Sequence, residues 1–151
     1  SQLEEYHNEN DFDIRPIPEL IHIKKIISPE KTIYLYKYKS YVFVDSLFFF
    51  KDSIKMNNEK LVLMSKRLIA FEGKSLEVKK YQYLDRSSNL FINDSLGLIM
   101  QKGQTHPYGT VVREYNTQDY RGLCNEIIKD SIFFSFEFDF KHLKEYLKLK
   151  K

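Results

Sequence analysis

The chain has 151 residues, enough for one hydrophobic core with short extensions. Aromatic residues make up 15% of it, all Phe or Tyr, and only five Gly and four Pro interrupt it, which excludes a low-complexity linker. A net charge of +3, with basic and acidic residues nearly balanced, is too small to indicate a nucleic-acid-binding protein by itself. The single cysteine, Cys124, excludes an internal disulfide framework and favours a reducing, intracellular compartment.

The N-terminal third of the sequence predicts an arm followed by strands. Residues 1–13 are polar and acidic, and we expect a flexible arm. From Thr32 to Phe50, β-branched and aromatic residues dominate, which is the strongest strand signal in the chain. This stretch is too long for one strand, so a break is expected near Lys39–Ser40 or Asp45–Ser46.

The segment Leu61–Phe71 (LVLMSKRLIAF) contains two apolar runs separated by Ser65, Lys66 and Arg67. It predicts two short strands, or one long bent strand, with the basic residues projecting from a turn. Further short strands are expected over 76–84, 90–100 and 110–115, with breaks at turn-forming residues such as Asn93–Asp94.

Apolar residues at helical spacing follow: Tyr120, Leu123, Cys124, Ile127 and Ile128. They form the stripe of an amphipathic helix docked on a core, and the helix is expected to span about Gln118 to Lys129. Gly122 weakens this helix by about 1 kcal/mol relative to Ala and favours close approach to the sheet.

The C-terminal segment alternates strictly from Ile132 to Phe138, which predicts a half-buried strand. Asp139 is expected to cap a last helix that turns Phe140, Leu143 and Leu147 inward. The predicted organisation is therefore an arm (1–13), a β domain (14–130) and a C-terminal strand–helix extension (131–151).

Taken together, the order of these elements resembles the pleckstrin-homology-like (PH-like)/GRAM superfold. LVLMSKRLIAFEG looks like the hairpin of such domains, and VKKYQYLD and YGTVVREYNTQDYRGLCNEII match a later strand and the final strand and helix. Within that group the order is most similar to the C-terminal PH-like domain of vacuolar-protein-sorting bridge lipid-transfer proteins. The resemblance implies a mainly β, antiparallel PH-like barrel or sandwich with one docked amphipathic helix.

The resemblance also implies a non-catalytic targeting module that engages phosphoinositides or a membrane-bound protein, in the cytoplasm or peripherally on a membrane. Lys and Arg close together on strand ends and loops bind phosphate groups. The candidate anion-binding residues are Lys37, Lys39, Lys66, Arg67, Lys79 and Lys80. The competing interpretation of each is an ordinary solvated side chain.

Two other kinds of function remain open from the sequence. An OB-fold subunit of a nuclear complex, such as a telomere or single-strand-binding complex, would use Tyr34, Tyr36, Tyr38 and Tyr41, interleaved with lysines, to stack single-stranded nucleic acid. A structural subunit would bury its C-terminal apolar residues against a partner. The candidate partner-binding residues are Phe134, Phe136, Phe138, Leu143 and Leu147.

The sequence disfavours enzymatic activity. Its four histidines are far apart, and one cysteine cannot complete a structural zinc site. No serine lies in a nucleophile-elbow pattern, and no glycine-rich phosphate loop is present. We therefore expect no catalytic residue, metal or cofactor.

Overall fold

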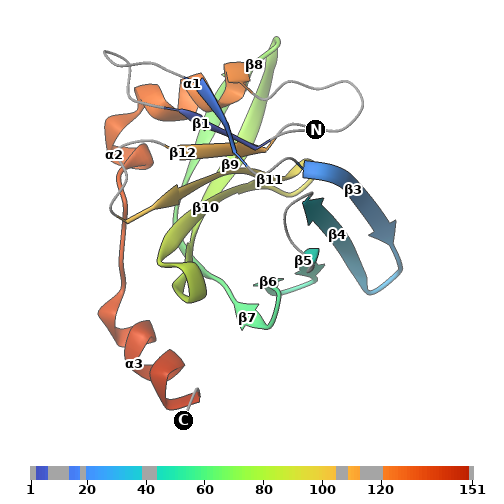
Figure 1. The fold of residues 1–151 in the computed structure, drawn as a ribbon, viewed down its shortest axis with the longest axis vertical. Coiled ribbons are helices and arrows are strands. Elements are labelled where there is room, and N and C mark those ends of the chain that lie inside the picture. Colours follow the sequence, from blue (N-terminus) through green and yellow to red (C-terminus); the bar gives the residue numbers. More distant parts are fainter. Residues whose placement is uncertain are drawn as a thin grey trace.

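The computed structural model describes residues 3–6, 14–17, 20–38, 44–104, 109–112 and 121–149. Its strands form two antiparallel sheets (Figure 1), which confirms the mainly β class expected from the sequence. Sheet A has the order β2-β1-β12-β11-β10-β9-β8, and sheet B has the order β3-β4-β5-β6-β7. The strands of sheet A are β1 (Leu3–Tyr6), β2 (Ile14–Ile17), β8 (Val62–Phe71), β9 (Lys74–Tyr83), β10 (Ser88–Asn93), β11 (Gly97–Gly103) and β12 (Gly109–Val112). Those of sheet B are β3 (Leu20–Ile27), β4 (Lys31–Tyr38), β5 (Val44–Phe50), β6 (Ile54–Met56) and β7 (Glu59–Lys60).

Most strands pair with their neighbours in sequence, and the two sheets are connected at both edges. Strands β2 and β3 follow each other across one edge, and β7 and β8 across the other. The break expected near Lys39–Ser40 falls between β4 and β5, whereas Asp45–Ser46 lies inside β5. Part of the expected arm forms β1, which pairs with β12, so Leu3–Tyr6 is not a free arm.

Strand β8 is continuous through Ser65, Lys66 and Arg67, so the predicted basic turn is wrong. These residues pair with β9, and the register shifts between Leu63 and Ser65. Because the ladder satisfies their backbone groups, polar side chains are accommodated at partly exposed positions of a long strand. The chain reverses instead at Glu72–Gly73, both of which have positive φ.

Two hydrophobic cores lie on opposite faces of sheet A. The inter-sheet core contains Tyr34, Tyr36 and Leu47 of sheet B and Tyr83 and Leu90 of sheet A, among others. The helix-side core lies between sheet A and the helices α1 (Arg121–Lys129) and α2 (Ser131–Phe134) (Figure 1).

Helix α1 confirms the amphipathic helix predicted from residue spacing, with its expected first residues, 118–120, outside the described part of the chain. Leu123, Cys124 and Ile127 are fully buried in the helix-side core. A Cβ atom at Gly122 would lie 3.1 Å from the Phe71 ring, so this glycine does permit close approach to β8.

The strand predicted over Ile132–Phe138 is wrong. Asp130 accepts a hydrogen bond from the backbone N–H of Phe133 and thereby caps the short helix α2. Phe133 and Phe134 are both buried, whereas a strand would point two adjacent side chains to opposite faces. Beyond α2 the segment 136–139 does not form a strand.

Helix α3 (Phe140–Leu149) is present as predicted, but its apolar residues are not turned into a core. Phe140 is 72% exposed and Leu147 is 50% exposed, and no residue of α3 is buried. Asp139 caps the helix as expected: its carboxylate accepts from the Lys141 N–H and contacts His142 Nδ1 at 2.6 Å.

The start of α3 is expected to be acid-sensitive. The hydrogen bond with His142 lowers the pKa of Asp139 below its ordinary value. A depressed carboxyl pKa contributes stability that is complete above the unfolded-state pKa, about 4, and is lost as pH falls through the folded-state pKa. We expect the backbone amides of α3 to lose hydrogen-exchange protection below about pH 4. In Asp139→Asn, which has no carboxylate at this position, the same titration should cause a smaller loss of protection.

Candidate functional site

The five basic candidates that the structure describes do not form one cluster. Lys66 and Lys79 lie opposite each other on one face of the β8–β9 hairpin, and Arg67 and Lys80 lie on the helix side of sheet A. Lys37 lies on sheet B, and Lys39 lies outside the described residues.

All four basic candidates of sheet A contact carboxylates of the chain itself. Lys66 lies 4.0 Å from Glu77, and Arg67 lies 3.3 Å from Asp130, with its guanidinium over the Phe133 ring. Lys79 lies 3.3 Å from Asp94. The neighbouring carboxylates offset part of the positive potential of Lys66 and Arg67, so this predicted pair attracts an external anion less strongly.

Lys79 illustrates this compensation. Burial by itself lowers the pKa of Lys79, but Tyr81 and the carboxylates of Asp94 and Glu77 outweigh it and raise the pKa above its ordinary value. The charge of Lys79 is therefore stabilised within the molecule.

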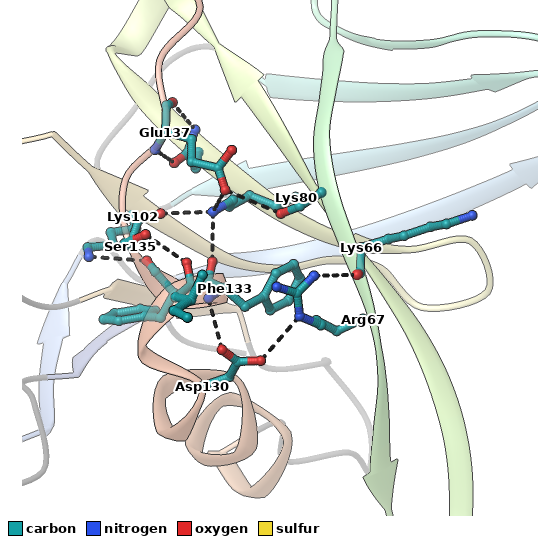
Figure 2. Close-up of polar contacts among 12 residues, drawn as sticks. Lys66, Arg67, Lys80, Lys102, Asp130, Phe133, Ser135 and Glu137 are labelled. Carbon is teal, nitrogen blue, oxygen red and sulfur yellow. Dashed lines mark hydrogen bonds and ion pairs between the residues drawn. The ribbon is translucent and has the colours of Figure 1, made fainter.

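Lys80 is fully buried and holds the C-terminal segment on sheet A (Figure 2). Its ammonium group donates to the carbonyl oxygens of Phe133 at 2.8 Å and Ser135 at 2.9 Å, and it pairs with the Glu137 carboxylate. Asn89 exchanges two hydrogen bonds with the backbone of Glu137. Lys80 is thus a structural residue, and its ammonium group does not reach an external ligand.

The apolar residues expected to bind a partner also lie in different environments. Phe134 belongs to the helix-side core, and the Lys102 ammonium lies 4.1 Å from the centroid of its ring. Phe136, Phe138 and Leu143 are half-buried, and Leu147 is exposed.

The outer face of sheet B, which points away from the inter-sheet core, differs in composition from the β8–β9 region of sheet A. Tyr34 and Leu47 pair across strands and point inward, so the residues that alternate with them point outward. One outward row joins Ile26, Ile33, Phe48, Lys55 and Lys60 across five strands. The apolar side chains of this face are Ile26, Ile33, Leu35, Val44, Phe48 and Phe50, all half-buried or exposed.

Lysines surround these apolar side chains, and we call this surface the lysine-rimmed face. Its cations are Lys24, Lys31, Lys37, Lys55 and Lys60. The acidic residues of the described strands of sheet B, Asp45 and Glu59, belong to the inward rows. Asp45 is buried and binds Arg86 through two hydrogen bonds. Along its strands the face is therefore apolar at its centre and positive at its margin, and the two turns at one end add the exposed carboxylates of Glu30 and Asp52.

Two contacts show how this face is built. Phe48 and Phe50 stack with ring centroids 6.2 Å apart, and the Lys55 ammonium lies 5.9 Å from the Phe50 centroid. Lys55 is also directly opposite Lys60. Like charges at paired positions destabilise a sheet, and an anion bound between these two lysines would relieve their repulsion.

The two described tyrosine side chains of β4, Tyr34 and Tyr36, are not exposed for stacking. Tyr34 and Tyr36 are buried in the inter-sheet core. The Tyr34 hydroxyl donates to the Ser95 carbonyl, and the Tyr36 hydroxyl accepts from the Leu98 N–H. The side chains of Tyr38 and Tyr41 lie outside the described part of the structure.

Sequence reasoning missed four of the five lysines of the lysine-rimmed face. The available signal was period-two alternation: in β4, Tyr34 and Tyr36 alternate with Ile33, Leu35 and Lys37. Alternation assigns the two sets to opposite faces but does not say which face meets the second sheet.

No protein-family model, curated protein or solved structure matches the chain. Among the described residues, no helix is long and apolar enough to cross a bilayer. The same residues contain no cluster of three or more His, Cys, Asp or Glu side chains arranged to hold a metal ion.

Proposed function

We propose that this protein is a non-catalytic binding module whose lysine-rimmed face docks on an anionic membrane surface. The observation that carries the proposal is the coincidence, on one face of sheet B, of five lysines, a central apolar strip and no outward acidic side chain among its described strands. The PH-like assignment is kept as an interpretation of the strand meander that precedes α1.

The physical contributions are of two kinds. A lysine near an anionic leaflet contributes about 1 kcal/mol, so five lysines supply roughly 5 kcal/mol before screening by salt. The exposed parts of Val44 and Phe50 enter the interface, where apolar burial contributes about 25 cal/mol per Å². Lysine stems extend along apolar surface while their ammonium groups meet the phosphates. An open sheet face with this composition fits a membrane surface better than a shaped protein pocket.

Reversing two charges of this face is expected to weaken membrane binding. Lys24→Glu with Lys37→Glu replaces about 2 kcal/mol of attraction by repulsion, so the partition coefficient on phosphatidylserine vesicles should fall by more than about thirtyfold. Both side chains are exposed, and the free energy of unfolding should change little. The measurement is vesicle co-sedimentation at low and physiological salt.

The matched control is Lys66→Glu with Lys148→Glu, which makes the same change in net charge on β8 and α3. It should retain most of the affinity. Equal losses in the two variants would assign binding to net charge alone. Binding to single-stranded oligonucleotide that exceeds binding to vesicles would contradict the proposal.

A further inference from the structure

Two lysines of the lysine-rimmed face, Lys55 in β6 and Lys60 in β7, lie directly opposite each other on neighbouring strands. The backbone N–H of Leu61 donates to the carbonyl oxygen of Ile54 at 2.9 Å, so these two residues form a hydrogen-bonded pair. In an antiparallel ladder the next pair is of the non-hydrogen-bonded kind, whose opposite Cβ atoms are about 4.5–5.5 Å apart. Two ammonium groups are therefore attached to one small area of this face.

The turn between β6 and β7 fixes the hairpin that carries these lysines. Asn57, in the turn, has positive φ, and its side-chain oxygen accepts from the Ser46 N–H at 2.9 Å. Its side-chain nitrogen donates to Asp45 and to the Tyr83 hydroxyl, both of which belong to buried side chains. The two lysines therefore stay opposite each other despite their repulsion, and a bound anion does not have to order the backbone.

A second pair of opposite lysines, Lys66 and Lys79 of the β8–β9 hairpin, shows how the chain compensates such a pair internally. Glu77 lies 4.0 Å from Lys66 and 3.7 Å from Lys79. Asp94 lies 3.3 Å from Lys79. The lysine pair of sheet A thus has two carboxylates of the chain beside it, and their negative charges offset the repulsion between the lysines.

The lysine pair of sheet B is not compensated in this way. In the described part of the chain, no carboxylate lies within 4.0 Å of the ammonium group of Lys55 or Lys60. Glu59, next to Lys60 in the sequence, belongs to an inward row and accepts from the backbone N–H groups of Leu84 and Asp85. Both positive charges of the pair therefore remain for an external anion.

The charge of this lysine pair selects the kind of anion. A phosphomonoester carries a charge of about −1.5 to −2 at pH 7 and has three terminal oxygens, so one such group can accept hydrogen bonds from both ammonium groups and neutralise both. The phosphodiester of an ordinary phospholipid carries a single negative charge and leaves one ammonium group uncompensated. The pair is therefore complementary to a phosphomonoester.

Phe50 indicates that the phosphomonoester belongs to a lipid. Its ring is 37% exposed on the same face, and the Lys55 ammonium lies 5.9 Å from the ring centroid, within cation–π distance. In the proposed docking Phe50 enters the lipid interface, so an anion on Lys55 lies at the depth of the lipid headgroups.

We infer that Lys55 and Lys60 form a site for the phosphomonoester headgroup of a membrane lipid. This inference rests on the membrane docking proposed above, and it names the lipid group that the lysine-rimmed face prefers.

The test compares binding of the full chain to vesicles that contain phosphatidic acid, a phosphomonoester lipid, and to phosphatidylserine vesicles of equal surface potential. The parent should bind the phosphatidic acid vesicles about fivefold more tightly, the effect of about one further contact between a lysine and an anionic group. Lys55→Gln with Lys60→Gln should abolish this preference and weaken binding to both lipids. Its thermal unfolding midpoint should not fall, because the substitutions remove a repulsion.

Two double variants are the matched controls. Lys24→Gln with Lys37→Gln removes two lysines of the same face that do not lie opposite each other. It should weaken binding to both lipids and keep the fivefold preference. Lys66→Gln with Lys79→Gln removes the compensated pair of sheet A and should keep both the preference and most of the affinity.

Equal affinity of the parent for the two kinds of vesicle would overturn this inference and leave the docking of the lysine-rimmed face intact. An undiminished preference in Lys55→Gln with Lys60→Gln would do the same. Binding to neither kind of vesicle would contradict the proposed function as well. Glycerol 3-phosphate, the soluble headgroup of phosphatidic acid, should compete only at millimolar concentration. Competition at micromolar concentration would assign the site to a soluble phosphomonoester and overturn the lipid assignment.

Discussion

Replacing Lys80 with Met is expected to lower the free energy of unfolding by about 3 kcal/mol. The ammonium group of Lys80 is fully buried and binds two carbonyl oxygens and the Glu137 carboxylate. Its removal leaves the buried carbonyl of Phe133 and the partly buried carbonyl of Ser135 without this donor. Glu137 is partly exposed and regains water, so the loss falls at the low end for a broken buried pair. Urea unfolding followed by circular dichroism measures it.

The control for this variant is Lys66→Met, which removes an exposed lysine from the neighbouring strand and should cost less than about 0.5 kcal/mol. A second readout is the titration of Lys102. Burial and the neighbouring charge of Lys80 lower the pKa of Lys102, so that pKa should rise in Lys80→Met. If Lys80→Met unfolded at the same urea concentration as the parent, Lys80 would not hold the C-terminal segment.

Gly97→Ala is expected to destabilise the fold by a similar amount, about 3 kcal/mol, through two causes that add. Gly97 has φ +79°, a conformation that costs an L-residue roughly 1–2 kcal/mol. A Cβ atom there would lie 2.6 Å from the Tyr36 hydroxyl and 3.1 Å from the Tyr34 ring. Tyr36 cannot move away easily, because it is buried and accepts from the Leu98 N–H. The midpoint of thermal or urea unfolding reports the change.

Gly73→Ala separates the two causes. Gly73 has nearly the same φ, +74°, but nothing lies within 4 Å of a Cβ built there. It should therefore show only the conformational cost, about 1 kcal/mol. Equal destabilisation by the two substitutions would mean that the contact with Tyr36 has no effect on stability.

Local patterns in the sequence predicted the elements that can be recognised without knowing which distant residues they pack against. The strand signal of Thr32–Phe50, the break at Asn93–Asp94 and the apolar stripe of α1 all correspond to observed elements. The alternation of polar and apolar residues over 132–138 predicts a strand, but residues 131–134 form a helical turn that places the adjacent Phe133 and Phe134 in one core. That core is formed by residues from distant parts of the chain, such as Phe91 and Met100.

The candidate site was less predictable because it too depends on contacts between residues far apart in the chain. The sequence places Lys66 beside Arg67, but it does not show that Glu77 and Asp130 lie against them. Nor does it show that Lys80 meets Glu137, 57 positions later in the chain. Which lysines keep their charge for an external anion depends on long-range pairing, and Lys24 and Lys55 became candidates only through the register of sheet B.

The most direct test of the proposed function is to map the surface that meets a membrane. Backbone amide signals of the ¹⁵N-labelled protein would be recorded with nanodiscs that contain phosphatidylserine and with nanodiscs of phosphatidylcholine alone. We expect broadening with the anionic nanodiscs only, centred on Lys24, Ile33, Phe48 and Lys55 of the lysine-rimmed face. Broadening centred on the β8–β9 hairpin around Lys66, or equal spectra with both nanodiscs, would contradict the proposed function.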